Sequence, residues 1–379
     1  MNMIATKLDR IKSHYQNGDE SMAFRMLMDF VIDTHDMKVY KKALAVNKAR
    51  EQKEPNKQKA TSLALDLIED LKSFPYQEKE PNKLLLDAKG IDKKYSSFHL
   101  EKVDIEIRTG DVWGLVGENG NGKTTLLKIL ANHIHFDKGE LHFNINSNSD
   151  YDLRTKLAYI PQRTAKWFGS VKYNLQYTAS NYGIYGEMNE LYVLMYMIRF
   201  GLWKFRNHNW SELSSGYKMR FELVRTLLRK PTILLLDEPL ANLDVLAQQL
   251  ILEDLKNISE SVSNPIGIIL SSQQLFEVEK ISDKVLFLKN GKPTHLSTAN
   301  SEKEESGVTV LELDSSASKE ELFKALEKFE VQEIVYNGGL YVIQVKNQTF
   351  AEVLGELITH FVQITYVRDI SKSSRRLFV

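Results

Sequence analysis

Gly117-Glu118-Asn119-Gly120-Asn121-Gly122-Lys123-Thr124-Thr125 is the stretch that decides the fold of this chain. It fits the phosphate-binding loop pattern G-x-x-x-x-G-K-[ST]. Residues 111–116 before it are typical of a short buried strand, and residues 126–131 after it are typical of the first turns of a helix. Glycines let backbone N–H groups face phosphate oxygens, and a helix N-terminus carries positive partial charge. The stretch therefore predicts a nucleotide site.

Two side chains of this loop are predicted to contact the phosphates and the metal ion. Lys123 is expected to reach the β- and γ-phosphates, and Thr124 is expected to offer its hydroxyl to Mg²⁺. The predicted nucleotide contacts in the loop are Asn119, Gly120, Asn121, Gly122, Lys123, Thr124 and Thr125.

A second stretch, residues 231–239, supplies carboxylates for the same chemistry. Its aliphatic run is typical of a central parallel strand that is buried on both faces. Asp237 and Glu238 follow at the carboxyl end, where open α/β sheets bind ligands. Asp237 is predicted to share the Mg²⁺ with Thr124, and Glu238 is predicted to polarise the attacking water as general base.

Composition narrows the class of protein. The 379 residues include 50 basic and 50 acidic side chains and no cysteine. The balanced charge gives no reason to expect a nucleic-acid partner, and the absence of cysteine excludes disulfides and thiolate metal sites. The longest apolar run, residues 191–198, is far shorter than the roughly 20 residues of a membrane helix. Because the N-terminus also lacks the pattern of a secretory signal, we expect a cytoplasmic chain.

Patterning along the chain predicts three domains. Residues 1–80 form an all-helical N-terminal extension, which is either a bundle packed on the next domain or a docking segment. Residues 81–295 form an α/β nucleotide-binding domain of the P-loop NTPase class. Residues 307–379 alternate as β-α-β-β-α-β, which predicts a ferredoxin-like α+β domain that serves for packing or for ligand sensing.

The motifs from residue 84 to residue 294, taken in order, resemble an ABC-type nucleotide-binding domain, the ATP-binding part of an ABC transporter. Residues 117–125 resemble its Walker A loop, residues 233–238 its Walker B strand, residues 213–217 its signature loop and residues 241–244 its D-loop. The resemblance implies ATP and Mg²⁺ as cofactors.

The resemblance also assigns residues outside the phosphate loop. Gln162 stands at the Q-loop glutamine, which implies a role at Mg²⁺ and in catalysis, and Tyr95 resembles the aromatic residue that stacks on adenine. Ser214 and Gly216 of the signature loop and Asp244 of the D-loop are implied to complete the ATP site of a second copy in a sandwich homodimer.

Three positions depart from the family pattern. Ser215 replaces the first glycine of the signature pair, and Tyr217 replaces its final glutamine. Gln273 stands in place of the switch histidine and is expected to act at the γ-phosphate. Glutamine can donate an N–H to phosphate but cannot carry a proton, so hydrolysis depends on Glu238.

The interpretation is an ATPase subunit that powers a membrane exporter through ATP-driven dimerisation. Its permease is expected on a separate chain, which would place this chain at the inner face of the plasma membrane. Aromatic residues 167, 168 and 173 suit contact with the permease or, equally, an ordinary core. The alternative interpretation is a soluble nucleotide-gated switch with weak or absent hydrolysis.

Overall fold

The N-terminal part of the chain is helical, as its apolar spacing predicts. The computed structural model describes residues 3–52, 57–77, 80, 82–297, 308–337 and 339–371. Its first helices are α1 (Met3–Gln16), α2 (Glu20–Thr34), α3 (Met37–Arg50) and α4 (Lys57–Lys72). The side chain of Asp19 caps α2 by accepting from Met22 N–H, and that of Asp36 caps α3 by accepting from the N–H groups of Lys38 and Val39.

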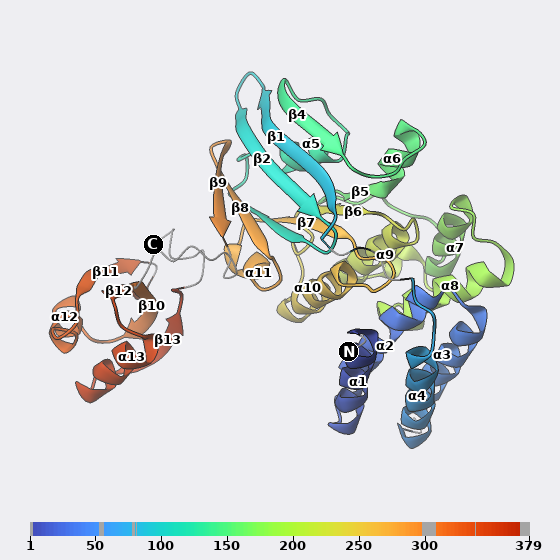
Figure 1. The fold of residues 1–379 in the computed structure, drawn as a ribbon, viewed down its shortest axis with the longest axis horizontal. Helices are drawn as coiled ribbons and strands as arrows, with labels where there is room; N and C mark the ends of the chain where they lie inside the picture. The colour runs from blue at the N-terminus through green and yellow to red at the C-terminus, as the bar shows by residue number, and fades with distance from the viewer. Residues whose placement is uncertain are drawn as a thin grey trace.

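Two sheets form the centre of the molecule (Figure 1). A three-stranded antiparallel sheet has the order β2-β1-β4, with β1 (Leu84–Lys94), β2 (His99–Arg108) and β4 (Lys138–Phe143). A six-stranded sheet has the order β5-β6-β7-β3-β8-β9. Its strands are β3 (Val112–Val116), β5 (Leu157–Ile160), β6 (Ile233–Leu236), β7 (Gly267–Ser272), β8 (Lys284–Lys289) and β9 (Lys292–Ser297). All neighbours in it are parallel except β8 and β9.

Helices cover the six-stranded sheet on both faces. On one face lie α5 (Lys123–Leu130) and α6 (Asp150–Lys156), and on the other lie α9 (Ser215–Leu227), α10 (Val245–Ser259) and α11 (Leu275–Glu279). Helix α7 (Val171–Asn181) contacts α9, and α8 (Gly186–Arg199) contacts α2 and α3, so these two helices lie beside the N-terminal helices. Short 3-10 turns follow at Trp203–Phe205 and Trp210–Glu212. Every residue of β3, β6 and β7 is buried, and most of their side chains are aliphatic, as is typical of parallel strands covered on both faces.

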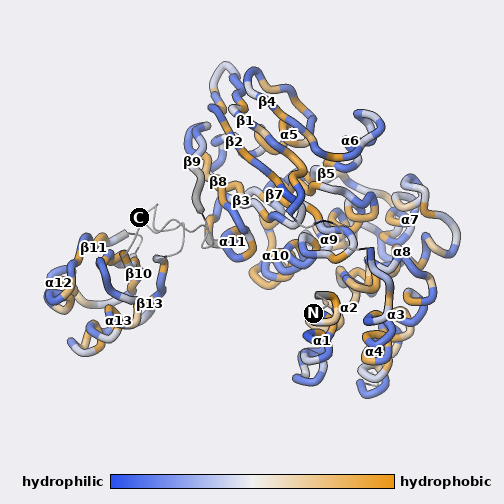
Figure 2. The backbone as a smooth tube through the Cα atoms, viewed as in Figure 1, coloured by the Kyte–Doolittle hydropathy of each residue, from blue (hydrophilic) through white to orange (hydrophobic). Residues whose placement is uncertain are grey.

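The central strands divide their side chains between two hydrophobic cores. Leu234 and Leu236 face a core that also contains Leu27 and Tyr40 of the N-terminal helices. Leu235 faces the other core, which lies against the three-stranded sheet. Figure 2 shows hydrophobic and hydrophilic residues alternating along β2, as its alternating burial requires. The N-terminal helices are thus packed on the nucleotide-binding region through a shared core.

The C-terminal residues form a third unit with its own core. Its elements are β10 (Val308–Ser315), α12 (Lys319–Ala325), β11 (Val331–Asn337), β12 (Leu340–Lys346), α13 (Phe350–Thr359) and β13 (Ile364–Asp369). The antiparallel sheet has the order β11-β12-β10-β13, and both helices pack on it. This arrangement confirms the predicted β-α-β-β-α-β fold.

Parts of the predicted domain boundaries lie outside the described residues. They are Pro81, where the second predicted domain begins, and residues 298–307, which include most of the gap between the second and third predicted domains. Within the described part of the chain, every helix falls short of the length and hydropathy needed to cross a bilayer.

Candidate nucleotide-binding and catalytic site

The phosphate loop lies between β3 and α5, as predicted. Gly122, the N-cap of α5, has φ of 100°, a conformation that residues with a side chain rarely adopt. A Cβ atom at Gly122 would lie 2.5 Å from Cζ of Phe98, so glycine is required there for space as well as for backbone conformation. Asn121 is buried, and its Oδ1 accepts from the backbone N–H of Asn290 at 3.0 Å. The loop is therefore fixed by contacts from β2 and from the turn after β8.

Lys123 joins this loop to the predicted catalytic carboxylate. Its side chain is only 5% exposed. The ammonium donates to the carbonyl oxygens of Gly117 at 2.6 Å and Glu118 at 3.2 Å, and it lies 3.3 Å from Oε1 of Glu238. The lysine is thus held at the centre of the site by both the loop and β6.

Thr124 and Asp237 come together as the predicted metal pair. Thr124 Oγ1 donates to Asp237 Oδ2 at 2.7 Å, and Asp237 is itself buried at the end of β6. A hydroxyl oxygen beside a single carboxylate fits Mg²⁺, which is usually held by one or two carboxylates together with substrate phosphates and water. These two residues would hold the ion, which would neutralise charge on the phosphates.

Both glutamines that the sequence assigns to the site contact the carboxylate of Glu238. Gln162 Nε2 donates to Glu238 Oε2 at 2.8 Å, and Gln273 Nε2 donates to the same oxygen at 3.1 Å. The predicted contact of Gln162 with Mg²⁺ stays a prediction, because this hydrogen bond uses only its amide nitrogen. Three segments far apart in sequence thus deliver side chains to one carboxylate.

The backbone of Glu238 is strained into the left-handed region, with φ of 47°. Its N–H donates to Ser271 Oγ at 2.8 Å, and the same hydroxyl donates to Asp237 Oδ1 at 3.0 Å. Ser271 therefore links both carboxyl residues, although the sequence did not identify it. The only signal was a Ser-Ser pair that ends the aliphatic run of β7.

Tyr159 is a second contact that the sequence did not identify. Its hydroxyl donates to Asp237 Oδ2 at 3.1 Å, the oxygen that also accepts from Thr124. Burial, and secondly the charge of Asp237, raises the pKa of Tyr159, so the hydroxyl keeps its proton. No sequence pattern marks this residue, because an aromatic residue in a buried strand usually signals packing alone.

The signature loop and the D-loop lie next to each other. Ser214 is the N-cap residue of α9, and Gly216 lies in the first turn of that helix. Ser215 Oγ donates to the carbonyl oxygen of Asn242 at 3.1 Å. Asp244 caps α10, since its Oδ1 accepts from Ala247 N–H at 2.9 Å.

The remaining predicted contacts lie around the loop. Tyr95 is 43% exposed, in the turn between β1 and β2, and its N–H donates to the carbonyl oxygen of Phe98. Since Phe98 packs under Gly122, Tyr95 belongs to the turn that borders the loop. Asn119 and Gly120 are exposed at the tip of the loop, and Thr125 is half-buried in α5.

Comparison with known proteins agrees with this geometry. Residues 100–241 match the family model described as ABC transporter. An export ATP-binding/permease protein of Rickettsia typhi is 28% identical over 239 residues, which cover 57% of this chain and 40% of that protein. The phosphonates import ATP-binding protein PhnC of Treponema denticola is 28% identical over 226 residues, which cover 55% of this chain and 88% of that protein.

Among solved structures, that of cbiO1 from Clostridium perfringens, part of the ABC transporter complex cbiONQ, has the same fold. It aligns with a TM-score of 0.50 and 23% identity over 57% of this chain and 88% of that one. The chain spans less than half the length of the Rickettsia relative. On the sequence match and the geometry of the phosphate loop, residues 100–241 belong to an ATP-binding domain of the ABC transporter family.

Proposed function

We propose that this chain is an ATP-binding and ATP-hydrolysing subunit that powers a membrane transporter through ATP-driven dimerisation. The observation that carries the proposal is the cluster at the carboxyl ends of β6 and β7. There Lys123, Gln162 and Gln273 all contact the carboxylate of Glu238, and Thr124 contacts Asp237. These contacts support the proposal, because they join the phosphate loop to the residues proposed as metal ligands and as general base.

Nucleotide binding follows from the loop. Backbone N–H groups of residues 120–124 and the N-terminus of α5 would face the phosphates, where the partial positive charge of the helix end stabilises anions. Lys123 would exchange its contacts with Gly117 and Glu118 for phosphate oxygens. The exposed ring of Tyr95 would stack on the base.

Hydrolysis is assigned to Glu238 as general base. Its carboxylate is held by two neutral amides, which orient it without transferring a proton. Gln273 would donate an N–H toward the γ-phosphate while Glu238 takes the proton of the attacking water. A positioned general base of this kind contributes roughly 10²–10⁴ in rate.

The second half of each site is assigned to a second copy of the chain. Ser214 is exposed at the start of α9, where the helix end would face a phosphate of the partner. Val245 and Leu246 beside Asp244 are 67% and 71% exposed. Such apolar side chains would be covered when two copies close around ATP.

The partner in the membrane is proposed to dock beside α7. Phe168 is 88% exposed, and Tyr173 and Tyr177 are exposed one turn apart on α7. Trp167 next to them packs edge-on against Phe221, which anchors the segment. Exposed aromatics on an anchored segment suit the cytoplasmic helices of a separate permease, which would hold this chain at the inner face of the membrane.

Export is the direction we propose, on the resemblance of the motif set and on the export protein among the relatives. The phosphonate importer among the relatives favours the opposite direction. The two directions differ in the permease, so sequencing the membrane protein that copurifies with the chain would decide between them.

A switch without turnover is the second candidate, and Gln273 is the observation that favours it. A histidine at this position could be charged beside phosphate, whereas the Gln273 amide stays neutral. In this candidate ATP closes the dimer and is released slowly.

The experiment is steady-state phosphate release by the full chain in ATP and Mg²⁺, beside Glu238→Gln, Gln273→His and the exposed control Glu320→Gln. The proposal expects turnover in the parent and the control, and a loss of about 100-fold or more in Glu238→Gln. ATP binding, measured in parallel, should survive in all four. A parent that binds ATP without turnover, and gains it in Gln273→His, would establish the switch instead.

A further inference from the structure

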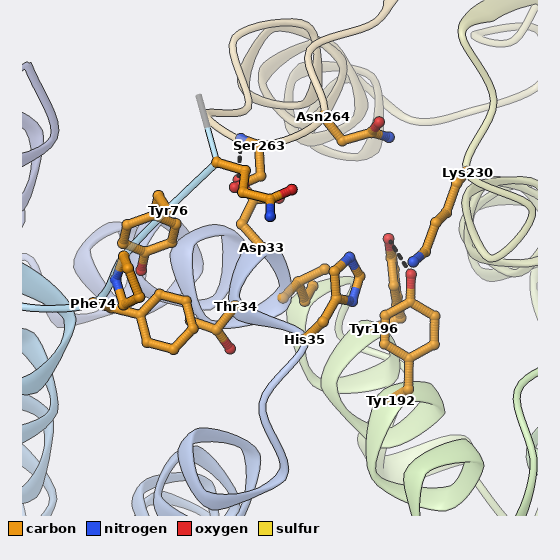
Figure 3. Close-up of a pocket in the computed structure, with 13 residues that line it drawn as sticks. Asp33, Thr34, His35, Phe74, Tyr76, Tyr192, Tyr196, Lys230, Ser263 and Asn264 are labelled. Carbon is orange, nitrogen blue, oxygen red and sulfur yellow. Dashed lines mark hydrogen bonds between the residues drawn. The ribbon is translucent and has the colours of Figure 1, made fainter. Parts of the chain in front are cut away.

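A cavity of about 570 Å³ lies away from the nucleotide site, where the N-terminal helices meet the rest of the molecule (Figure 3). Its walls come from the end of α2, the segment after α4, helix α8 and the loops before β6 and β7. Its volume falls within the range of roughly 300–1,000 Å³ that small-molecule sites occupy. The residues that define its chemistry are His35, Phe74, Tyr76, Tyr192, Tyr196, Lys230 and Asn264.

One end of the cavity is aromatic. Phe74 and Tyr76 lie together there with ring centroids 5.1 Å apart, as Figure 3 shows. The Tyr76 hydroxyl donates to the carbonyl oxygen of Phe30, so its ring rather than its hydroxyl is left to face the cavity. An aromatic ring of a ligand packs well against such a wall.

The other end carries hydrogen-bond donors. The ammonium of Lys230 lies 5.8 Å from the ring centroid of Tyr192, and Figure 3 shows it pointing toward the Tyr192 and Tyr196 hydroxyls. These two hydroxyls are 3.4 Å apart. Burial raises the pKa of both tyrosines, so they remain protonated donors at neutral pH.

Among the described residues that line the cavity, the single carboxylate is already hydrogen-bonded. Asp33 accepts from Ser261 Oγ at 2.8 Å and from the N–H groups of Val262 and Ser263 at 3.2 Å each. Its oxygens are therefore occupied by the loop before β7. They compete only weakly with a ligand for the hydrogen-bond donors across the cavity. A cavity with donors at one end and rings at the other favours a ligand that has acceptor oxygens joined to an aromatic ring.

We propose that this cavity binds a small aromatic carboxylate. The ring lies against Phe74 and Tyr76, and the carboxylate lies at Lys230 and Tyr196. Tyr192 is fully buried, and its hydroxyl supports that of Tyr196 from behind at 3.4 Å. Lys230 comes three residues before β6, and Asn264 three residues before β7. A bound acid would therefore contact the end of α2 and the loops that lead into β6 and β7, the strands that carry the nucleotide site at their opposite ends.

The test is calorimetric titration of the full chain with indole-3-acetate, with the neutral indole-3-acetamide as matched probe. Two cavity variants, Lys230→Met and Tyr192→Phe, are compared with Lys319→Met, which removes an exposed lysine from the C-terminal unit. Each keeps most of the apolar part of the side chain it replaces, and the circular dichroism of each is compared with that of the parent.

We expect saturable binding of the acid by the parent and by Lys319→Met, and none of the amide. Lys230→Met should weaken binding about tenfold or more, a factor that corresponds to 1.4 kcal/mol. Tyr192→Phe should weaken it less. The proposal is overturned if the acid fails to bind up to its solubility limit, if the amide binds as well as the acid, or if both cavity variants bind like Lys319→Met.

Discussion

Replacing Arg199 with methionine tests whether the N-terminal helices are an integral part of the fold. The side chain of Arg199, at the end of α8, is fully buried. Its Nε donates to Asp29 Oδ1 of α2 at 2.6 Å, and its Nη1 donates to Asp254 Oδ1 of α10. Arg25 of α2 also contacts Asp254, at 2.5 Å. One guanidinium thus ties α2 to both α8 and α10.

The expected loss can be worked from these contacts. Arg199→Met keeps the aliphatic volume but removes two hydrogen bonds between charged groups, each of which contributes about 1.5–3 kcal/mol. Asp254 retains Arg25, whereas Asp29 loses its ion-pair partner in a site where burial already raises its pKa. Breaking a buried pair from one side costs about 3–5 kcal/mol, and we expect a loss of that size in the free energy of unfolding.

The assay is urea unfolding followed by tryptophan fluorescence, since Trp203 and Trp210 follow α8 closely in the chain. Arg154→Met, which removes an exposed arginine on α6, is the control. Adding Asp29→Asn to Arg199→Met should recover part of the loss, because it removes the unpaired charge. A loss no larger than that of the control, or no recovery in the double variant, would refute the reasoning.

Three further changes test separate parts of the account. Burial raises the pKa of Asp33 to about 6 from 3.8, so its protonated form stabilises the fold; that contribution is complete below pH 3.8 and is lost as the pH rises through 6. The contribution of Asp33 to the free energy of unfolding should therefore fall by about 3 kcal/mol over this pH interval in the parent, and this fall should be missing in Asp33→Asn. A difference between the two proteins that stays constant with pH would contradict this. Ser271→Ala should lower kcat about tenfold with little change in KM, because the hydroxyl positions Asp237 and Glu238; Ser271→Thr should restore turnover, and failure to do so would count against a positioning role. Gly122→Ala should abolish ATP binding as measured by equilibrium dialysis, because its Cβ would lie 2.5 Å from Phe98. ATP binding that persists in this variant would contradict the prediction.

The sequence predicted the elements well because their signals are local. The glycines and lysine of residues 117–125 and the aliphatic run before Asp237 each depend on a few neighbouring residues, and the structure places both as predicted. The C-terminal β-α-β-β-α-β order was predicted for the same reason. Its helices follow the N-cap residues Ser318 and Thr349, where reciprocal side-chain and backbone hydrogen bonds form capping boxes.

Long-range contacts could not be predicted in the same way. Ser271 and Tyr159 reach Asp237 only because β7 and β5 flank β6, a strand order that one sequence does not reveal. The bond from Gln162 to Glu238 likewise depends on side-chain orientation at the sheet edge. The cavity beneath α2 requires five separate segments to meet, and the lone His35 that lines it gave no sign of this in the sequence.

The most direct test of the central claim is a mixing experiment with two disabled chains. Lys123→Ala removes the phosphate-loop lysine, and Ser214→Arg blocks the signature loop at an exposed position. If two copies share each ATP site, a mixed dimer contains one intact site, formed by Lys123 of one chain and Ser214 of the other. The account predicts that each variant alone has no turnover and that the mixture regains phosphate release. A mixture that is no more active than the sum of its separate components would contradict it.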